Sequence, residues 1–451
     1  MADVAIHVTI TLNAPLLVTA RQVGFVWESQ QYIPGSVLRG SLAHNLLFEC
    51  NLSEAERLAL ETAPSSHRDN CAFHRLFYAN DPPRFGNAFP GLEPPVGILP
   101  LTARTCKRYS GFKRKDVDNE RHGVFDILIR QVLSEKSGKP LTARCSIANC
   151  KKKAEPFGER VYALRGNRYV SPRALPRRLA RTAIGRERGA VAERLLYTLE
   201  ALGEQMDLDE LDQNNQPKKA HTTFQTTVWA EEAHERELRR ALRKVHYLGA
   251  AVSRGMGRVA ISARKQAKPT PTSERLAVMA NLLSKGVEPK RPTGLLPKGA
   301  DWLERLLIFN QLWAQERKSF VDKQKSSADG WYFSVDLQAD TLLSRVNGPA
   351  YQLTPDLLGL PDKVQLVRAF ASHRQVGGWS SAWGMPKPTA PAIVAGSVFL
   401  YHIPGGDVTL SRDVLKQLHT LERQGVGQRR EEGYGWLQIC TPFHLETEVR
   451  S

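Results

Sequence analysis

Two widely separated segments of the chain alternate strictly between apolar and polar residues. In the first, apolar residues occupy every second position from Val4 to Leu12, and in the second they do so from Trp331 to Ala339. A period of two is typical of a β-strand with one buried face. We therefore predict that each segment begins a separate β-sheet.

Each predicted strand is followed, later in the chain, by the same series of elements. A helical pattern over 238–245 precedes a glycine- and arginine-rich loop, Ser253–Arg258, and a second helical pattern over 414–421 precedes the loop Gly427–Gly435. A short strand is expected after each loop. When Gly249 is aligned with Gly425, the second loop is two residues longer than the first.

This repeat predicts an α+β fold made of two tandem ferredoxin-like (RRM-like) units, each an antiparallel sheet covered by helices on one face. The expected boundaries are 1–268 for the first unit, 269–328 for a helical linker with helices over 276–283 and 302–313, and 329–451 for the second unit. A basic insertion at about 101–216 lies within the first unit. We expect it to end in a helix over 190–206 and a disordered polar loop over 207–219.

Charge is concentrated in this insertion. The 451-residue chain has a formal net charge of +17, and residues 101–190 hold 23 Lys/Arg against 8 Asp/Glu. This excess of positive charge creates an electrostatic field that attracts a polyanion, which would bind through phosphate contacts and counterion release. Nucleic acid is favoured because aromatic residues are interleaved with the charges, at Tyr109, Phe112, Phe157, Tyr162 and Tyr169. The alternatives are an insertion that only adds solubility and, with less support, binding to an acidic membrane surface.

The two glycine-rich loops are the first candidates for contact with nucleic acid. Glycines allow close approach to backbone N–H groups, and arginines supply charge-assisted hydrogen bonds to phosphates. The alternative is a pair of simple glycine turns with solvated arginines. Neither loop has the spacing of a nucleotide-binding P-loop. The candidate residues in these loops are Ser253, Arg254, Gly255, Gly257, Arg258, Gly427, Arg429, Arg430 and Gly433.

A third loop, Ser372–Gly384, combines glycines with Arg374, Trp379 and Trp383. Its aromatic rings are candidates for stacking on unpaired bases, an interaction of about 1–3 kcal/mol per base. Packing of the two tryptophans between the units is the alternative explanation.

Two sequence motifs resemble those of the RAMP superfamily of CRISPR-associated proteins. One is the segment Tyr32–Leu42, which includes Pro34-Gly35-Ser36 and Arg39-Gly40, and the other is the loop Ser253–Arg258. The second half repeats both features at Ile393–Val398 and Gly425–Gly435. The insertion resembles that of the subunit that caps the CRISPR RNA (crRNA) 5′ handle in type III-D effector complexes.

This resemblance implies a non-catalytic, crRNA-binding subunit of an antiviral type III effector complex. It implies RRM-like folds, a bound 5′ handle, and contacts with a polymerase-like large subunit and backbone RAMP subunits. Arg39 and the basic side chains of the insertion would extend the RNA track. A general basic RNA scaffold without a CRISPR connection remains an alternative, since it would share the charge and the repeat.

Four residues in the insertion have the ligand chemistry of zinc: Cys106, His122, Cys145 and Cys150. The spacing of Cys145 and Cys150 suits a ligand pair, although the other intervals match no standard zinc finger. We predict a structural zinc site that holds an insertion with too few apolar residues for a core of its own. Four unrelated side chains are the alternative. Asp126 is a candidate carboxylate beside the site, or an acid/base partner of His122.

An enzymatic alternative comes from the same superfamily, in the metal-independent endonucleases that cut CRISPR repeat RNA. In this chain His44 is the candidate general acid/base, with Tyr32 and Lys107 as helpers. A packed or solvated helix histidine explains His44 more simply, so no enzyme activity is expected.

No apolar run is long enough to cross a membrane, and the first residues lack the pattern of a secretion signal. The six cysteines are too few for a disulfide framework. A cytoplasmic protein without membrane contact is therefore expected.

Overall fold

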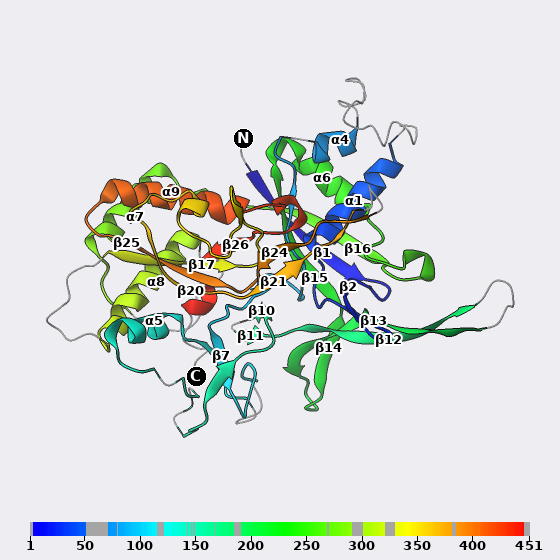
Figure 1. The fold of residues 1–451 in the computed structure, drawn as a ribbon, viewed down its shortest axis with the longest axis horizontal. Coiled ribbons are helices and arrows are strands. Elements are labelled where there is room, and N and C mark those ends of the chain that lie inside the picture. Colours follow the sequence, from blue (N-terminus) through cyan, green and yellow to red (C-terminus); the bar gives the residue numbers. More distant parts are fainter. Residues whose placement is uncertain are drawn as a thin grey trace.

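The computed structural model has a mixed α+β fold with several antiparallel sheets, as predicted (Figure 1). It describes residues 3–50, 71–78, 80–114, 121–141, 143–145, 147, 149–166, 168–184, 191–267, 270–290, 301–320, 330–380 and 385–445. Within these ranges, the side chains of 183, 184, 191–195 and 380 are left undescribed.

The first sheet is built around β1, the predicted N-terminal strand. Its strand order is β16-β1-β15-β4, with β5 also paired to β15. Helices α1 and α6 pack against it through a core that includes Ile6, Leu38 and Leu242. The bounds are β1 Asp3–Leu12, α1 Gly35–Phe48, α4 Ala72–Phe77, β4 Arg84–Phe85, β5 Phe89–Pro90, β15 Thr223–Glu231, α6 Glu235–Arg243 and β16 Val259–Gln266.

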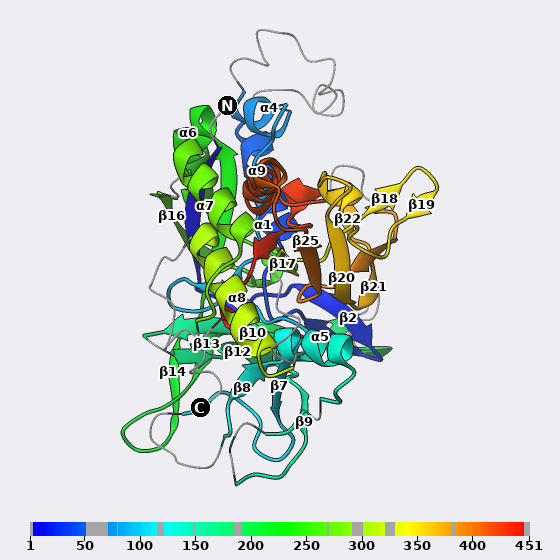
Figure 2. The ribbon, with the colours of Figure 1, turned by 90° about the vertical axis from the view of Figure 1, so that its left-hand side faces the viewer.

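The second sheet has the strand order β20-β25-β17-β26. Helices α7 and α8, predicted as a linker, share its apolar core with α9 (Figure 2). The bounds are α7 Ser273–Lys285, α8 Trp302–Arg317, β17 Trp331–Leu337, β20 Gln365–Phe370, β25 Val398–Ile403, α9 Val408–Gln424 and β26 Leu437–Ile439. Three small hairpins flank this sheet: β18 Ser344–Arg345 with β19 Gly348–Pro349, β21 His373–Val376 with β24 Ala390–Ile393, and β22 Trp379–Ser380 with β23 Met385–Pro386.

The predicted helix over 190–206 is wrong, because this segment is the strand β13, Val191–Leu211. It pairs with β12, Arg173–Ile184, to form a long ribbon that extends from the body of the protein (Figure 1). Oppositely charged side chains face each other across the ribbon: Arg178 Nε lies 2.9 Å from Glu200 Oε2 and Arg177 Nη1 lies 2.9 Å from Glu204 Oε1. These cross-strand ion pairs and the backbone pairing of β12 with β13 stabilise the strand, although the leucines at 195, 199 and 202 have the spacing of a helix.

The predicted disordered loop over 207–219 is wrong as well. Strand β13 continues to Leu211, and β14, Pro217–His221, returns beside it. The turn between them is closed by Asp212, whose carboxylate accepts hydrogen bonds from the backbone N–H groups of Asn214 and Gln216. On the same sheet, β3 (Val26–Ser29) pairs with β13, and β2 (Thr19–Val23) pairs with β3.

Among the described residues of the insertion, the other strands form two three-stranded sheets, one of them together with β6 from just before the insertion, and one segment forms a helix. The first sheet is β8-β7-β9, from Val124–Asp126, Ala103–Cys106 and Ala154–Pro156, and the second is β11-β10-β6, from Arg168–Val170, Val161–Arg165 and Val96–Ile98. The helix α5, Leu128–Ser137, joins the core of the second unit rather than that of the first.

The insertion also has a small core of its own, contrary to expectation. Its aromatic residues supply most of the core: Phe112, Tyr162 and Tyr169 are buried together with Phe443 from the C-terminal segment. On sequence grounds these three rings were part of the aromatic pattern that favoured nucleic acid. Their burial leaves them unavailable for contact with bases.

A buried ionic triad joins the insertion to the second unit. Asp126 ends β8, Asp336 lies on β17, and His444 lies in the C-terminal 3₁₀ turn, Pro442–His444. His444 Nδ1 is 2.9 Å from Asp126 Oδ2, and His444 Nε2 is 2.7 Å from Asp336 Oδ1. The strand β17 is buried on both faces, because Trp313 of α8 stacks on Tyr332 and the triad covers Asp336, whereas β1 has the half-buried pattern predicted for both strands.

The remaining lone pairs of the triad's carboxylates are also engaged. The Thr102 hydroxyl and the Leu128 backbone N–H donate to Asp126, and the Ser334 hydroxyl and the Thr441 backbone N–H donate to Asp336. Burial by itself would lower the pKa of His444, but the carboxylates of Asp336 and Asp126 outweigh it and raise this pKa to about 10.

The two units meet where the second glycine-rich loop lies on the start of α1. A Cβ atom added to Gly35 would be 2.0 Å from the Phe85 carbonyl oxygen and 3.0 Å from the Gly433 Cα atom. Nearby, Arg374 Nε donates to Asp340 Oδ2 at 2.6 Å, and Arg374 Nη2 lies 3.4 Å from the Tyr32 hydroxyl. Gly35 is therefore required by the approach of another backbone.

No helix among the described residues is long and apolar enough to cross a membrane.

The triad predicts a pH dependence of stability. Because the folded-state pKa of His444 is raised from 6.5 to about 10, its contribution is complete below pH 6.5 and is lost as the pH rises toward 10. In urea unfolding, the free energy of unfolding should fall over this window in the native chain. His444→Gln should be less stable by about 3–5 kcal/mol at pH 6, since it leaves two buried carboxylates without their cation. An exposed-site control, His44→Gln, should follow the native profile, and a native-like profile for His444→Gln would contradict the role of the triad.

The contact at the start of α1 predicts opposite effects for two glycines of one helix. Gly35→Ala should lower the free energy of unfolding by about 1–3 kcal/mol, because its Cβ atom collides with backbone. The Cβ atom added in Gly40→Ala would have no atom within 4 Å, so this substitution should stabilise the helix by up to about 1 kcal/mol. Thermal unfolding of both variants measures the difference. Equal stability of the two would show that the loop does not rest on Gly35.

Candidate nucleic-acid interface and metal cluster

The first glycine-rich loop, predicted at Ser253–Arg258, begins earlier in the structure and is taken from here on as residues 248–257. It presents a compact exposed turn. Ala251 and Gly255 both have left-handed backbone conformations, with φ of 59° and 81°, and they flank the 3₁₀ turn Val252–Arg254. Ser253 and Arg254 are exposed, as is Arg258 at the start of the following strand. These predicted residues therefore lie together on one accessible turn.

The second glycine-rich loop, residues 426–435, has the same backbone course. Arg429 and Gly433 have φ of 56° and 97° and flank the 3₁₀ turn Arg430–Glu432. In both loops the last glycine faces a carbonyl oxygen that excludes a side chain: Gly257 faces Leu248, and Gly435 faces Val426. The loops thus match residue for residue, 248–257 against 426–435.

This match corrects the alignment expected from the helix spacing. Gly249 corresponds to Gly427, because each lies against a carbonyl oxygen near the start of its unit, that of Leu17 and that of Leu342. The following residue in each loop donates its backbone N–H to the same carbonyl. The second loop is not two residues longer, and the difference between the units lies between helix and loop.

The two loops differ in chemistry despite their common backbone. In the second loop Arg429 pairs with Glu432 at 2.6 Å and lies over the Tyr434 ring, and Lys387 also pairs with Glu432 at 2.6 Å. Glu432 is buried, and Arg430 donates to the Gln424 carbonyl oxygen. The charges of this loop are largely neutralised within the protein. Gly427 is exposed, whereas Gly433 is buried against the first unit.

In the first loop Arg254 keeps an exposed position beside the ring of Tyr197. Its Nη1 donates to the Tyr197 hydroxyl at 2.7 Å. Elsewhere on the same sheet, Leu196 is 63% exposed and Phe25, in the turn between β2 and β3, is 66% exposed. The contact with Tyr197 was not predicted, because 190–206 was expected to be a helix. A strand assignment would have put Tyr197 on the ribbon face.

The other predicted contact residues lie apart from the first loop's turn. Arg39 is half-buried with its guanidinium 4.9 Å from the centre of the Phe77 ring. Arg374 belongs to the contact between the units. Trp379 is 61% exposed on β22, as a stacking residue would be, whereas Trp383 lies outside the described residues. The structure does not test the RNA-binding role of any of these side chains.

The four predicted metal ligands converge. The ligand atoms of Cys106, His122, Cys145 and Cys150 all lie within 4.8 Å of one another, in an arrangement that could hold a metal ion. Cys106 ends β7, His122 precedes β8, and the other two lie on the segment between α5 and β9. The short three-stranded sheet therefore brings together residues that sequence spacing alone could not connect.

We call the four side chains of Cys106, His122, Cys145 and Cys150 the metal cluster. The surroundings of this cluster of candidate ligands suit thiolates. Backbone N–H groups of Ile147 and Lys152 donate to the thiols of Cys145 and Cys150. Burial raises the pKa of the Cys145 thiol to about 12, so a bound cation would be needed to hold it as a thiolate. Burial also lowers the pKa of His122, which favours the neutral imidazole that binds metals. The donor set of three sulfurs and one nitrogen fits a tetrahedral metal site.

Asp126 has a structural role rather than that of a free acid beside the metal cluster. Its carboxylate is held by His444, Thr102 and the backbone of Leu128. The candidate general acid His44 lies exposed on α1.

Comparison with known proteins finds one family model that matches part of the chain. Residues 274–441 match the family described as CRISPR-associated protein (Cas_Cmr3). The matched segment runs from the start of α7 to just beyond β26 and so covers the second unit with both of its additional helices. No curated protein matches the chain.

Among solved structures, one similar chain comes from the cryo-EM structure of the Type III-B Cmr-beta bound to cognate target RNA and AMPPnP. It is 10% identical, with coverage of 92% of this chain and 88% of that one, and a TM-score of 0.32. A Cas6 protein of Thermus thermophilus is 11% identical, with coverage of 48% and 75% and a TM-score of 0.24. TM-scores this low carry no argument about function. The type III-D subtype stays a prediction. The match of residues 274–441 confirms the resemblance to CRISPR-associated proteins.

Proposed function

We propose that this chain is a non-catalytic subunit of a type III CRISPR effector complex that holds the 5′ handle of the guide RNA. The observation that carries the proposal is the first glycine-rich loop, an exposed turn that presents Arg254 and Ser253 beside Tyr197. Exposed arginines and accessible backbone at a glycine turn suit phosphate groups, and neighbouring aromatic rings suit unpaired bases.

The strand orders support the RRM-like architecture in this proposal. In the first unit, the strands of the βαββαβ series β1, α1, β4, β15, α6, β16 lie in the order β16-β1-β15-β4. The second sheet has the same order, with β17, β20, β25 and β26 in the equivalent places. This order is that of a ferredoxin-like unit, a fold that many RNA-binding modules share. In the second unit a 3₁₀ turn, Asp356–Leu358, stands where the first unit has α1.

The proposal includes partners and a place of action. The chain would work in the cytoplasm in antiviral defence, in contact with the crRNA, with a polymerase-like large subunit and with backbone RAMP subunits. These partners follow from the resemblance to the RAMP superfamily. The net charge of +17 supports the RNA contact.

Binding is favoured over cleavage by the places of the candidate catalytic groups. His44 is exposed on α1, the Tyr32 hydroxyl lies within 3.4 Å of an Arg374 nitrogen, and Lys107 lies in the insertion beside the metal cluster. General acid/base catalysis needs such groups within hydrogen-bond reach of one reacting atom. Their three different environments do not suit that requirement.

The proposal assigns structural zinc to the metal cluster. Three cysteines and one histidine form a closed set of four ligands, which leaves no open position for catalysis. Bound zinc would hold Cys106 on β7 to the segment of Cys145 and Cys150, and so fix the edge of the β8-β7-β9 sheet. Its contribution is then to folding of the insertion.

Binding of a repeat-derived RNA tests the main proposal. The native chain should bind RNA that carries the 5′ handle more tightly than RNA without it, in a salt-sensitive manner, and should leave the RNA intact in EDTA. Arg254→Ala should weaken binding and reduce the slope of log K against log salt by about 0.7, the loss of one single-strand phosphate contact. The control Arg345→Ala removes an exposed arginine that pairs with Asp356 and should keep the native slope.

Two outcomes would contradict the proposal. An unchanged slope of log K against log salt in Arg254→Ala would show that this loop does not contact the RNA phosphates. Metal-independent cutting of the RNA that disappears in His44→Ala would identify the chain as a processing nuclease.

Metal analysis tests the zinc assignment. Purified protein should contain about one zinc per chain by mass spectrometry, and Cys145→Ser should lose it together with part of the thermal stability. Cys71→Ala removes a buried thiol outside the metal cluster and should retain the metal. Zinc retained by Cys145→Ser at the native level would show that the four side chains are not its ligands.

A further inference from the structure

A pocket of about 490 Å³ opens next to the metal cluster, and every residue that lines it is a cation. The lining residues are Lys107, Arg108, Lys151, Lys152 and Lys153. All five side chains are exposed. We call this concavity the lysine pocket.

The metal cluster and the backbone together determine the shape of the lysine pocket. Lys107 and Arg108 directly follow the ligand Cys106, and the three consecutive lysines directly follow the ligand Cys150. The two sulfur atoms lie 3.8 Å apart, so the two cationic segments are joined at the cluster. The Lys107 N–H donates to the Lys153 carbonyl oxygen at 3.1 Å, which aligns the segments side by side.

The charges of the lysine pocket are not neutralised by any described residue of the protein. Across the described part of the chain, none of these five cations forms a salt bridge, whereas Arg177 and Arg178 of the ribbon each pair with a glutamate. Arg108 instead lies 5.3 Å from the centre of the Tyr109 ring, and that ring stacks on the ligand His122 at 4.3 Å. Five like charges around one concavity repel one another, and a bound polyanion would relieve this repulsion.

The chemistry of the lysine pocket favours phosphate groups over an acidic protein surface. Protein interfaces are depleted in lysine and are anchored by apolar or aromatic side chains in packed pockets. No apolar side chain lines this pocket. Lysine ammonium groups are compact point charges that bind phosphates without demanding a fixed orientation, which suits a flexible single strand.

We propose that the lysine pocket binds the phosphate backbone of RNA, and that this binding is coupled to metal occupancy of the adjacent cluster. The inference rests on the proposed function only in that RNA is the ligand. With metal bound, Cys106 and Cys150 hold the two cationic segments at one fixed separation. Without metal, the pairing of β7 with β9 still aligns the segments, but the cysteine side chains no longer fix their separation, and phosphate binding weakens. Linkage requires the reverse effect to be of equal size, so bound RNA must stabilise the metal.

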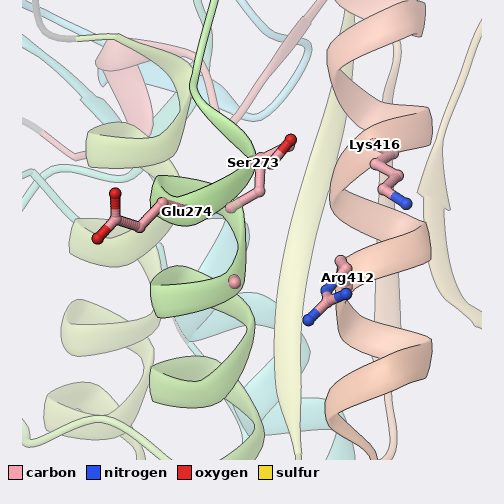
Figure 3. A pocket seen from close by; sticks show the side chains of 6 residues that line it. Ser273, Glu274, Arg412 and Lys416 are labelled. Atoms are coloured by element: carbon pink, nitrogen blue, oxygen red, sulfur yellow. The ribbon is translucent and has the colours of Figure 1, made fainter.

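A pair of matched variants tests the lysine pocket in the full-length chain. Lys151→Gln/Lys152→Gln removes two of its charges. The control, Arg412→Gln/Lys416→Gln, removes two charges from a separate groove of about 340 Å³ between α7 and α9, where Glu274 and Ser273 also lie (Figure 3). Binding of handle-bearing RNA should weaken several-fold in the pocket variant, with a salt slope smaller by about 1.4, or two single-strand phosphate contacts. The control should keep the native slope.

Release of zinc to a coloured chelator tests the coupling without any activity assay. RNA should slow zinc release from the native chain and from the control variant, and at the same RNA concentration it should slow release from the pocket variant clearly less. RNA that slows release equally in all three proteins would overturn the coupling. An unchanged salt slope in the pocket variant, or a loss of binding to poly-glutamate with RNA binding intact, would overturn the assignment to RNA.

The readouts separate failure of this inference from failure of the proposed function. If native protein binds RNA with and without the handle equally well, handle recognition fails. The lysine pocket still stands in that case if its variant has the smaller slope. If the handle is recognised and the pocket variant keeps the native slope, only the pocket inference fails.

Discussion

The arrangement of the whole chain depends on one buried ionic contact, in which His444 lies between Asp126 and Asp336. The three residues come from the insertion, the second sheet and the C-terminal turn, and all are almost fully buried. Two carboxylates without a cation in this position would be strongly destabilising, so the contact forms only when all three segments are in place. It thereby fixes the insertion to the second unit, although the insertion is part of the first unit in sequence. The candidate ligand His122 lies at the other end of the short segment that ends in Asp126, so the same contact helps to position the group of four candidate metal ligands.

The two glycine-rich loops show how one backbone can serve two tasks. Both loops use glycines where a carbonyl oxygen excludes a side chain, and both have a left-handed residue on each side of a 3₁₀ turn. In the second loop the acidic residue Glu432 neutralises its cations, and the turn lies against Gly35. In the first loop the corresponding position is Arg254, and the turn remains exposed. We infer that the second unit uses its loop for contact between units, which leaves the first loop for a ligand.

Much of this organisation could be predicted from local sequence. Periodicity located β1, β17 and the helices α6, α7, α8 and α9, because one face of each element is apolar. The four candidate metal ligands could be selected by residue type, since few positions in the insertion carry sulfur or imidazole. Their convergence could not be derived from spacing, because it depends on pairing of β7 with β8 and β9. The strand β13 was mistaken for a helix because leucines at 195, 199 and 202 have helical spacing, while its stability as a strand comes from partners more than ten residues away. The triad was invisible for the same reason, since His444 and Asp126 are distant in sequence.

The central claim is that the first glycine-rich loop holds the 5′ handle of a guide RNA. Ultraviolet crosslinking of the chain to a handle-bearing RNA, followed by mass spectrometry of the crosslinked peptides, tests it most directly. The account predicts crosslinks from peptides within 248–258 and from the ribbon residue Tyr197 to handle nucleotides, with the RNA uncut. Crosslinks confined to other parts of the chain, or to nucleotides outside the handle, would contradict it.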